Sequence, residues 1–421
     1  MRISTLQAFN NGVAGLQRNY ANATRTQEQI STGNRILTPA DDPVASVRLL
    51  QLEQQQNVLS QYNANLTAAK NSLTQEEVTL NSVNTVLQRV RELAVQAGNG
   101  ALDPQDRKSI AAELGEREDE LLSLMNTRNA RGEYLFAGFQ GKTQPFVRGA
   151  DGSYSYEGDE GQRKLQIASS LNIPISDNGK SVFENVTNAG RYQLSFTAQP
   201  GSTLSVSAPL VQDEVALTAN PAFPAAGIGV HFTSETDYIV YDLNAPPADF
   251  ADPFADPNLV LASGSLDEKT DTSDKLVFRG VVMQFDGTPA AGDSVEVTLD
   301  ATQQKQGILS TIANLRSALE SPTMGNQGVR DAVAVGLTNL DHGMVSVDAA
   351  RGNIGARLNV IETTQTDNED VTLVNKSVQA ELKELDYAEA LSRLSFQTVI
   401  LEAAQQSYVK ISGLNLFNAM R

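Results

Sequence analysis

Leucine recurs at every seventh position over one long stretch of the chain, and this repeat constrains the fold more than any other feature of the sequence. The members of the repeat are Leu52, Leu59, Leu66, Leu73, Leu80 and Leu87. A seven-residue repeat places its members on one stripe of an α-helix, and such a stripe is stable when a neighbouring helix covers it. The repeat therefore predicts a long helix that packs along other helices.

Capping signals bound this helix and its neighbour. Asp42 is an expected N-cap with Pro43 at the first helical position, because the carboxylate accepts from free amides and proline lacks only a donor that would be unpaired there. Gly98 and Gly100 are expected to end the helix. Asp103-Pro104 repeats the capping chemistry and predicts a second helix to about Arg128. Its apolar stripe consists of Ile110, Leu114, Leu121 and Leu124.

Both ends of the chain carry further apolar stripes at spacings of three and four, which are typical of helices in coiled coils. The first stripe runs through Leu6, Phe9, Val13, Leu16, Tyr20, Ala23, Gln27 and Ile30, and Gly33 follows it. The C-terminal stripes are Val371, Val374, Val378, Leu382 and Leu385, then Ile400, Ala404, Ser407, Ile411 and Leu414. We expect the two ends to pair and to keep apolar edges that need partner subunits.

Between residues 133 and 302 the apolar period changes from helical to about two, which predicts short strands. Tyr154 and Tyr156, followed by Leu165 and Ile167, alternate as the two strands of a hairpin would. Further alternation predicts strands at 192–196 and 294–299. The Pro-rich and Asp-rich segment 245–258 is expected to be a solvated loop.

These patterns predict an α+β chain: an elongated helical rod of long antiparallel, coiled-coil-like helices from both termini, with a mostly β inserted domain. The expected segments are an N-terminal assembly helix and turn at 1–42, an inner rod at 43–132, the inserted domain at 133–302, a second inner rod at 303–384 and a C-terminal assembly helix at 385–421.

Composition and motifs argue against most chemical functions. A net charge of −18 repels nucleic acids and anionic lipids, and no apolar run approaches the 18 residues of a membrane span. Cysteine is absent, the two histidines lack ligand spacing, and Gly141-Lys142-Thr143 is only half of a phosphate loop. We therefore expect no enzyme activity, no catalytic residue, no cofactor, no metal site, no nucleic-acid binding and no membrane insertion. Glycan binding by Tyr154, Tyr156, Tyr238 or Tyr241 stays open as an alternative for the insertion, beside packing of these rings in its core.

Two motifs are similar to those of the flagellin superfamily. Gln29-Ile30-Ser31-Thr32-Gly33 followed by Asp41-Asp42-Pro43 resembles its turn between the outer and inner helices, and the segment 87–96 resembles its inner helix. The segments 1–5, 132–138 and 414–418 are more similar to the hook–filament junction branch, the FlgL type, than to filament flagellin. Filament flagellin remains the alternative.

The resemblance implies a structural subunit of the bacterial flagellum that lies between a FlgK-type hook-associated protein and flagellin, in a ring of identical subunits. It also implies type III export without a cleaved signal, an export chaperone and an extracellular location on the flagellum. At Arg89 and Leu93 it implies subunit contacts, and recognition by the flagellin-sensing Toll-like receptor as a hypothesis. The stripes and the resemblance together give these expected assembly residues: Leu6, Phe9, Val13, Leu16, Tyr20, Ile30, Arg89, Leu93, Ile400, Ile411, Leu414 and Phe417.

Overall fold

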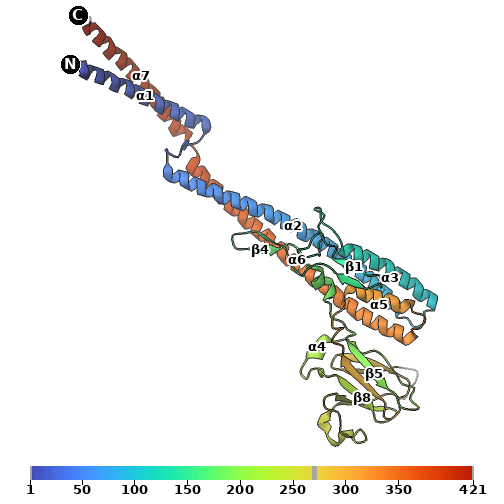
Figure 1. Cartoon of the computed structure of the whole chain (residues 1–421). Coiled ribbons are helices and arrows are strands. Elements are labelled where there is room, and N and C mark those ends of the chain that lie inside the picture. Colours follow the sequence, from blue (N-terminus) through green and yellow to red (C-terminus); the bar gives the residue numbers. More distant parts are fainter. Residues whose placement is uncertain (1, 268–272, 420–421) are drawn as a thin grey trace. The chain divides into compact units, whose positions relative to one another are not determined.

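The computed structural model describes residues 2–267 and 273–419, with residues 2–6, 8 and 411–419 described only as helical backbone. Figure 1 shows helices at both ends of the sequence and strands in its middle. The α-helices are α1 (Arg2–Thr32), α2 (Pro43–Ala97), α3 (Pro104–Met125), α4 (Glu214–Thr218), α5 (Ile308–Glu320), α6 (Asn326–Lys383) and α7 (Tyr387–Ala419). Short helical turns are η1 (Lys180–Glu184), η2 (Pro253–Ala255) and η3 (Pro257–Leu259). The predicted α+β class, with long terminal helices and a sheet-rich middle, is confirmed.

The strands fall between α3 and α5 in the sequence. They are β1 (Phe146–Arg148), β2 (Tyr154–Tyr156), β3 (Lys164–Gln166), β4 (Asn172–Pro174), β5 (Tyr192–Thr197), β6 (Ser205–Val206), β7 (Leu210–Val211), β8 (Ile228–Phe232), β9 (Asp237–Asp242), β10 (Val260–Ser265), β11 (Asp274–Phe278), β12 (Val281–Asp286) and β13 (Ser294–Leu299). The strands expected at 192–196 and 294–299 are therefore present as β5 and β13. The segment 245–258 contains only the turn η2 and the start of η3.

The chain forms two compact units. Unit 1 comprises Met1–Leu66, Ile167–Leu171 and Glu362–Arg421, and unit 2 comprises Thr67–Gln166 and Asn172–Ile361. The boundaries fall inside the long helices α2 and α6, which each contribute to both units. The five segments expected from the sequence follow helix ends instead, and that division stays a prediction.

The leucine repeat and the caps explain α2 and α3. Helix α2 begins at Pro43, where the Ala45 amide donates to Asp42 Oδ1 at 3.0 Å. Helix α3 begins in the same way, with the Asp106 amide donating to Asp103 Oδ1 at 2.7 Å. The members of both stripes that lie inside unit 2 and are buried are Leu73, Leu80, Leu87, Ile110, Leu114 and Leu121. Met125, one turn after Leu121, takes the buried place expected for Leu124.

Four helical segments of unit 2 pack together, namely α2 after residue 66, α3, α5 and α6 up to residue 361 (Figure 1). Salt bridges at the surface join them, since Arg91 Nε lies 2.7 Å from Asp341 Oδ1 and Arg89 Nη2 lies 2.7 Å from Glu113 Oε1. Exposed pairs of this kind contribute only about 0–1 kcal/mol each. The buried apolar stripes therefore supply most of the stability.

The predicted hairpin between Tyr154-Tyr156 and Leu165-Ile167 is wrong. Strand β2 pairs with β1, placing Phe146 opposite Tyr156, and β3 pairs with β4, placing Leu165 opposite Ile173. The strands themselves alternate as expected. The pairing was wrong because alternation predicts which side chains of a strand point to the same face. It does not predict which other strand is the hydrogen-bonded partner.

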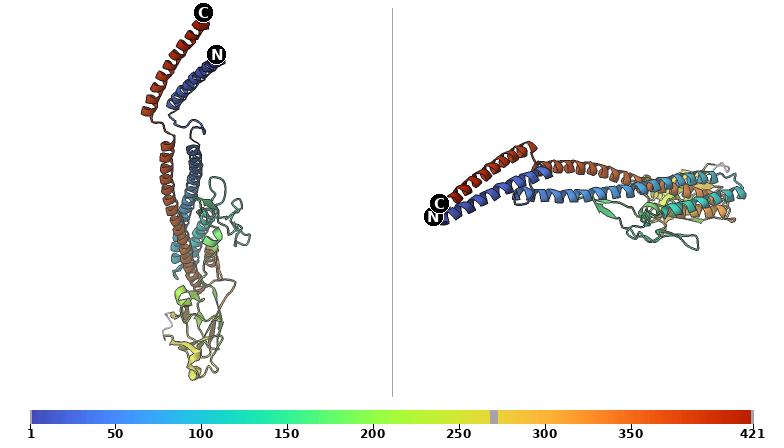
Figure 2. Two further views of the ribbon diagram at one scale, coloured as in Figure 1. Left: turned by 90° about the vertical axis from the view of Figure 1, so that its left-hand side faces the viewer. Right: turned by 90° about the horizontal axis from the view of Figure 1, so that it is seen from above.

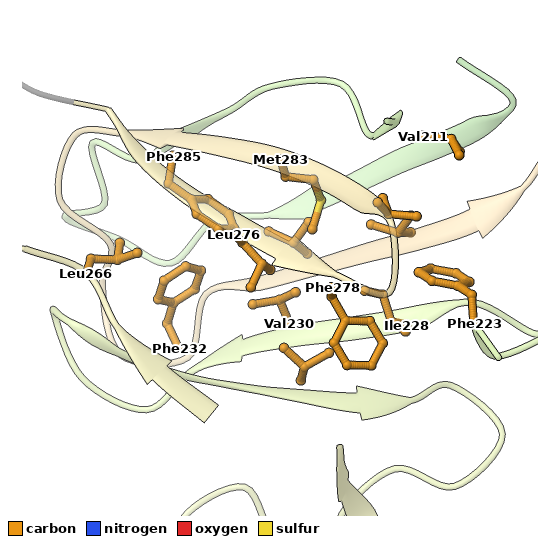
Figure 3. Packing of buried hydrophobic residues seen from close by; sticks show 14 of the residues in the cluster. Val211, Phe223, Ile228, Val230, Phe232, Leu266, Leu276, Phe278, Met283 and Phe285 are labelled. Atoms are coloured by element: carbon orange, nitrogen blue, oxygen red, sulfur yellow. The ribbon is translucent and has the colours of Figure 1, made fainter. Parts of the chain in front are cut away.

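The remaining strands form two sheets that pack face to face. The first sheet has the order β10-β9-β8-β13-β5, and in the second β12 pairs with β11, β6 and β7. Their side chains share one core, in which Phe232 of the first sheet meets Phe285 of the second edge to face at 5.6 Å (Figure 3). This arrangement is that of a small β-sandwich with its own apolar core.

A two-segment neck joins the β-sandwich to the helices of unit 2. The Asn188 amide donates to Gln304 O at 3.0 Å, and the Gln306 amide donates to Val186 O at 2.9 Å. Asn339 of α6 docks the neck, because its Nδ2 donates to Asn188 Oδ1 at 2.9 Å and its Oδ1 accepts from the Ala189 amide at 2.7 Å. The neck is thus hydrogen-bonded both internally and to the helix.

Glu118 is the most enclosed charge of the helical part. It lies in the middle of the α3 stripe with no exposed side-chain surface. Arg316 of α5 contacts it at 2.9 Å, and Arg148 of β1 and the hydroxyl of Tyr154 of β2 also bind its carboxylate. One carboxylate therefore connects α3, α5 and the β1–β2 hairpin.

A second buried network surrounds Glu76 of α2. The Asp177 amide donates to Glu76 Oε1 at 3.0 Å, and the Asp177 carboxylate accepts from both terminal nitrogens of Arg357 in α6, at 3.1 and 2.9 Å. Glu76 and Asp177 are 1% and 4% exposed. Burial and then the negative charge of Asp177 raise the pKa of Glu76 from 4.5 to about 8.

Replacing Glu76 with glutamine is expected to remove a pH dependence of folding stability. Between 4.5 and about 8 the folded chain keeps the Glu76 proton while the unfolded chain releases it, so stability falls as the pH rises. The slope approaches about 1.4 kcal/mol per pH unit inside this window. Urea unfolding across the window measures it, with Glu77→Gln on the same helix as the control. An unchanged slope in Glu76→Gln would contradict the assignment.

Candidate assembly surface

Helices α1 and α7 of unit 1 lie side by side and antiparallel, with both chain ends at the same end of the pair (Figure 2). The rings of Phe9 and Tyr408 are 5.3 Å apart near that end. Towards the other end, Arg393 Nη2 lies 3.4 Å from Gln29 Oε1. This is the pairing of terminal helices that the stripes predicted.

The pair covers only part of its apolar side chains. Of the predicted assembly residues on these helices, Val13, Leu16 and Ile30 are half-buried. Those that remain exposed are Phe9 at 49%, Tyr20 at 64% and Ile400 at 40%. Leu6, Ile411, Leu414 and Phe417 lie in the helices, but their side chains are outside the described residues.

Further apolar side chains of unit 1 are exposed on α2, α6 and α7. We call these residues, with Phe9, Tyr20 and Ile400, the exposed apolar set. Its other members are Val44, Val47, Leu50, Val58, Val371, Leu373, Val374, Leu391, Phe396, Val399 and Val409. Single exposed apolar residues are ordinary, but a concentration of them on paired helices is typical of a surface that another chain covers.

The two predicted assembly residues of α2 have different environments. Arg89 is exposed, where its Nε donates to Glu113 Oε1 at 2.8 Å and its Nη1 donates to Glu92 Oε2 at 3.0 Å. Leu93 is only 1% exposed and packs inside unit 2. The expectation of a subunit contact through the Leu93 side chain therefore needs correction, since this side chain holds helices of its own chain together.

The turn between α1 and α2 fixes the helix pair to the junction of α6 and α7. Asp41 Oδ2 accepts from the amides of Leu37 and Thr38 at 2.9 and 3.0 Å, which closes the turn. The Arg35 amide donates to Lys383 O at 2.8 Å, and the Leu385 amide donates to Gly33 O at 3.0 Å. The sequence motif at 29–43 thus has a structural role.

Gly33→Ala is expected to destabilise this turn. Gly33 has a φ of +70°, and an added Cβ would lie 2.9 Å from the Tyr387 hydroxyl. The left-handed backbone alone costs a non-glycine residue about 1–2 kcal/mol. The Arg35 amide donates to Lys383 O across the turn, so faster hydrogen exchange of this amide measures the loss of turn stability. Gly100→Ala, which meets no atom within 4 Å, is the matched control, and equal exchange in both variants would contradict the prediction.

The four tyrosines considered for glycan binding have packing roles. Tyr154 binds Glu118, the Tyr156 hydroxyl donates to Phe136 O at 2.9 Å, Tyr238 packs against the sandwich core and Tyr241 is 5% exposed. Within residues 2–267 and 273–419, no cluster of three or more potential metal ligands occurs. In the same described part, none of the helices combines the length and apolar character that crossing a membrane requires.

Comparison with known proteins points to one family. Residues 3–141 match the bacterial flagellin N-terminal helical region. The flagellar hook-associated protein 3 of Salmonella typhimurium is 35% identical over 45% of this chain and 58% of its own length, and that of Escherichia coli is 34% identical over the same shares. A crystal structure of flagellar hook associated protein-3 from Legionella pneumophila matches 79% of this chain and 98% of that chain, with 27% identity and a TM-score of 0.64.

The helical part of the chain is similar to that of flagellins and of flagellar hook-associated protein 3. The family region at 3–141 covers α1, the turn motif, α2 and α3, so the resemblance inferred from residues 29–43 and 87–96 is confirmed. The match covers less than two thirds of the length of these curated relatives. Both relatives are named flagellar hook-associated protein 3.

Sequence reasoning missed the buried charges that organise the helical part of unit 2. Glu118 occupies the stripe of Ile110, Leu114 and Leu121, and Glu76 lies between Leu73 and Leu80 at helical spacing. Carboxylates on an apolar stripe are almost never fully buried without partners. The position of Glu118 and Glu76 on apolar stripes was therefore the sequence signal that could have predicted these buried networks.

Proposed function

We propose that the chain is a structural subunit of the bacterial flagellum at the junction between hook and filament. It joins a FlgK-type hook-associated protein to flagellin, and copies of the chain form a ring. The exposed apolar set of unit 1 carries this proposal, because paired helices with uncovered apolar faces gain stability when neighbouring subunits bury them. The similarity to hook-associated protein 3 supports the proposed place in the flagellum.

The proposal includes export through the flagellar type III apparatus with a dedicated chaperone, and assembly outside the cell. Subunit contacts are assigned to the terminal stripes and to the exposed Arg89. Binding of Arg89 by the flagellin-sensing Toll-like receptor is a separate hypothesis. Failure of the purified chain to stimulate receptor-bearing cells would remove it.

A deletion strain tests the proposed function and separates it from filament flagellin. Loss of a junction subunit leaves hooks without filaments and releases flagellin into the medium, as electron microscopy and immunoblots would show. Loss of the filament protein leaves hooks with no released flagellin. A deletion strain with normal filaments would overturn both assignments.

Removing residues 1–32 is expected to leave a soluble and folded chain that no longer supports motility. Helix α1 packs mainly against α7, while most of the large fully buried side chains lie in unit 2, so its loss leaves that core intact. Circular dichroism measures the remaining helix, and swarming of the complemented deletion strain measures assembly. Loss of the whole fold, or retained motility, would contradict the prediction.

A further inference from the structure

The α1–α2 turn and helix α7 enclose a polar cavity of about 300 Å³ within unit 1. Three arginines line it, namely Arg25 of α1, Arg35 of the turn and Arg393 of α7. A cavity of about 10–15 Å³ already holds a water molecule, so this one has room for a side chain. Asp41 and Asp42 also line it, so the three arginines exceed the acidic side chains by one, and the open cavity is accessible to a group from outside.

The arginines differ in how far the chain itself satisfies them. Arg25 is paired with Asp41, whose side chain is 7% exposed. Arg35 donates one side-chain hydrogen bond, to Leu382 O at 3.1 Å, and has no ion-pair partner among the described residues. Arg393 has only long contacts, at 3.9 Å to Glu389 and 3.4 Å to Gln29. A guanidinium group has five donors, so Arg35 and Arg393 keep most of theirs for another acceptor.

The backbone that carries Arg35 is fixed before any ligand arrives. Arg35 is held by its own backbone bond to Lys383, and Asn34 forms a bridge with Glu384. The neighbouring Asp41 carboxylate closes the turn through two amides. Donors that are already ordered lose less entropy on binding, which favours recognition of a carboxylate by the planar guanidinium.

The same unit carries a complementary acidic surface. Residues 362–389 contain eight acidic side chains and two lysines. The acidic residues are Glu362, Asp367, Glu369, Asp370, Glu381, Glu384, Asp386 and Glu389. Among the described residues, Glu389 is the one that forms an ion pair, and that pair is long and exposed. A chain with an open arginine cavity and an acidic stretch that forms a single ion pair among the described residues is complementary to a second copy of itself.

We propose that the arginine cavity receives a carboxylate side chain from residues 362–389 of a second copy of the chain. Arg35 and Arg393 bind the incoming carboxylate, while Arg25 and Asp41 shape the cavity wall. This inference rests on the proposed function, because only assembly places two copies side by side. It adds a specific polar contact that sets the register of neighbouring subunits, beside the apolar contacts of the helices.

A charge exchange tests the contact in the full-length chain. Reversing the cavity in R35E/R393E, or the stretch in D367K/E369K/D370K, is expected to weaken self-association at least tenfold in analytical ultracentrifugation. Mixing the two variants is expected to restore it, since the reversed cavity then meets the reversed stretch. Raised salt is expected to weaken the wild-type contact. Circular dichroism confirms the fold, and wild-type self-association by R35E/R393E would overturn the proposal.

Cross-linking on intact flagella supplies an independent readout. The chain has no cysteine, so introduced thiols report without background. Cells that express Asn22→Cys and Asp370→Cys chains together are expected to give a covalent dimer with a thiol cross-linker, whereas Asn22→Cys with Ala101→Cys is the control. Cross-links from Asn22→Cys to another flagellar protein alone would overturn the proposal. Absence of the wild-type chain from flagella would instead overturn the proposed function.

Discussion

Replacing Glu118 with alanine is expected to lower the free energy of unfolding by about 3–5 kcal/mol. The substitution removes the carboxylate that binds Arg148, Arg316 and Tyr154, and it leaves two guanidinium groups without their buried partner. Among carboxylates, Arg148 and Arg316 then keep only their surface partners, Asp119 at 2.9 Å and Glu320 at 3.6 Å, and lose the buried carboxylate that joins them. Urea denaturation of the purified chain measures the change.

Glu120→Ala on the same helix is the control for this experiment. Glu120 is 47% exposed and pairs with Arg117 at 2.6 Å on the surface, so its loss is expected to cost about 0–1 kcal/mol. A loss in Glu118→Ala no larger than in Glu120→Ala would show that the carboxylate does not organise the helical part of unit 2.

Leu80→Ala is expected to cost about 2–5 kcal/mol of unfolding free energy. Leu80 is a fully buried member of the leucine repeat, so the smaller side chain leaves a cavity among the helices of unit 2. Removing buried methyl groups loses both transfer energy and packing contacts. Thermal or urea unfolding followed at the helical signal measures the effect.

Leu50→Ala is the matched comparison, because it is the same substitution on the same helix at a side chain that is 64% exposed. It is expected to leave the unfolding free energy within about 0.5 kcal/mol of the wild type. Its effect belongs to assembly, since Leu50 is part of the exposed apolar set. Equal destabilisation by the two substitutions would contradict the assigned burial.

The helices were predictable because their signals are local. The aspartates of Asp42-Pro43 and Asp103-Pro104 accept from free amides within one helical turn, and Gly33 adopts the left-handed backbone after α1. None of these features depends on distant residues. The leucine repeat likewise gives the buried face directly.

The pairing of strands and the contacts between distant residues could not be predicted from the sequence in the same way. Tyr154 pairs its strand with β1 because Arg148 and Tyr154 both reach Glu118, which lies on a helix well before them in the sequence. Likewise the arginine cavity combines residues near 30 with residues near 395, and their approach depends on the pairing of α1 with α7. Such non-local contacts leave no periodic pattern in the sequence.

The neck places the entry and exit of the β-sandwich within hydrogen-bonding distance of each other, through Asn188 and Gln304. A domain whose two ends emerge together can be exchanged without altering the path of the flanking chain. The helices therefore accept a foreign module of comparable end spacing at this position. The sandwich is in this sense a replaceable cassette, free to diverge or to be engineered for display while the helical framework stays unchanged.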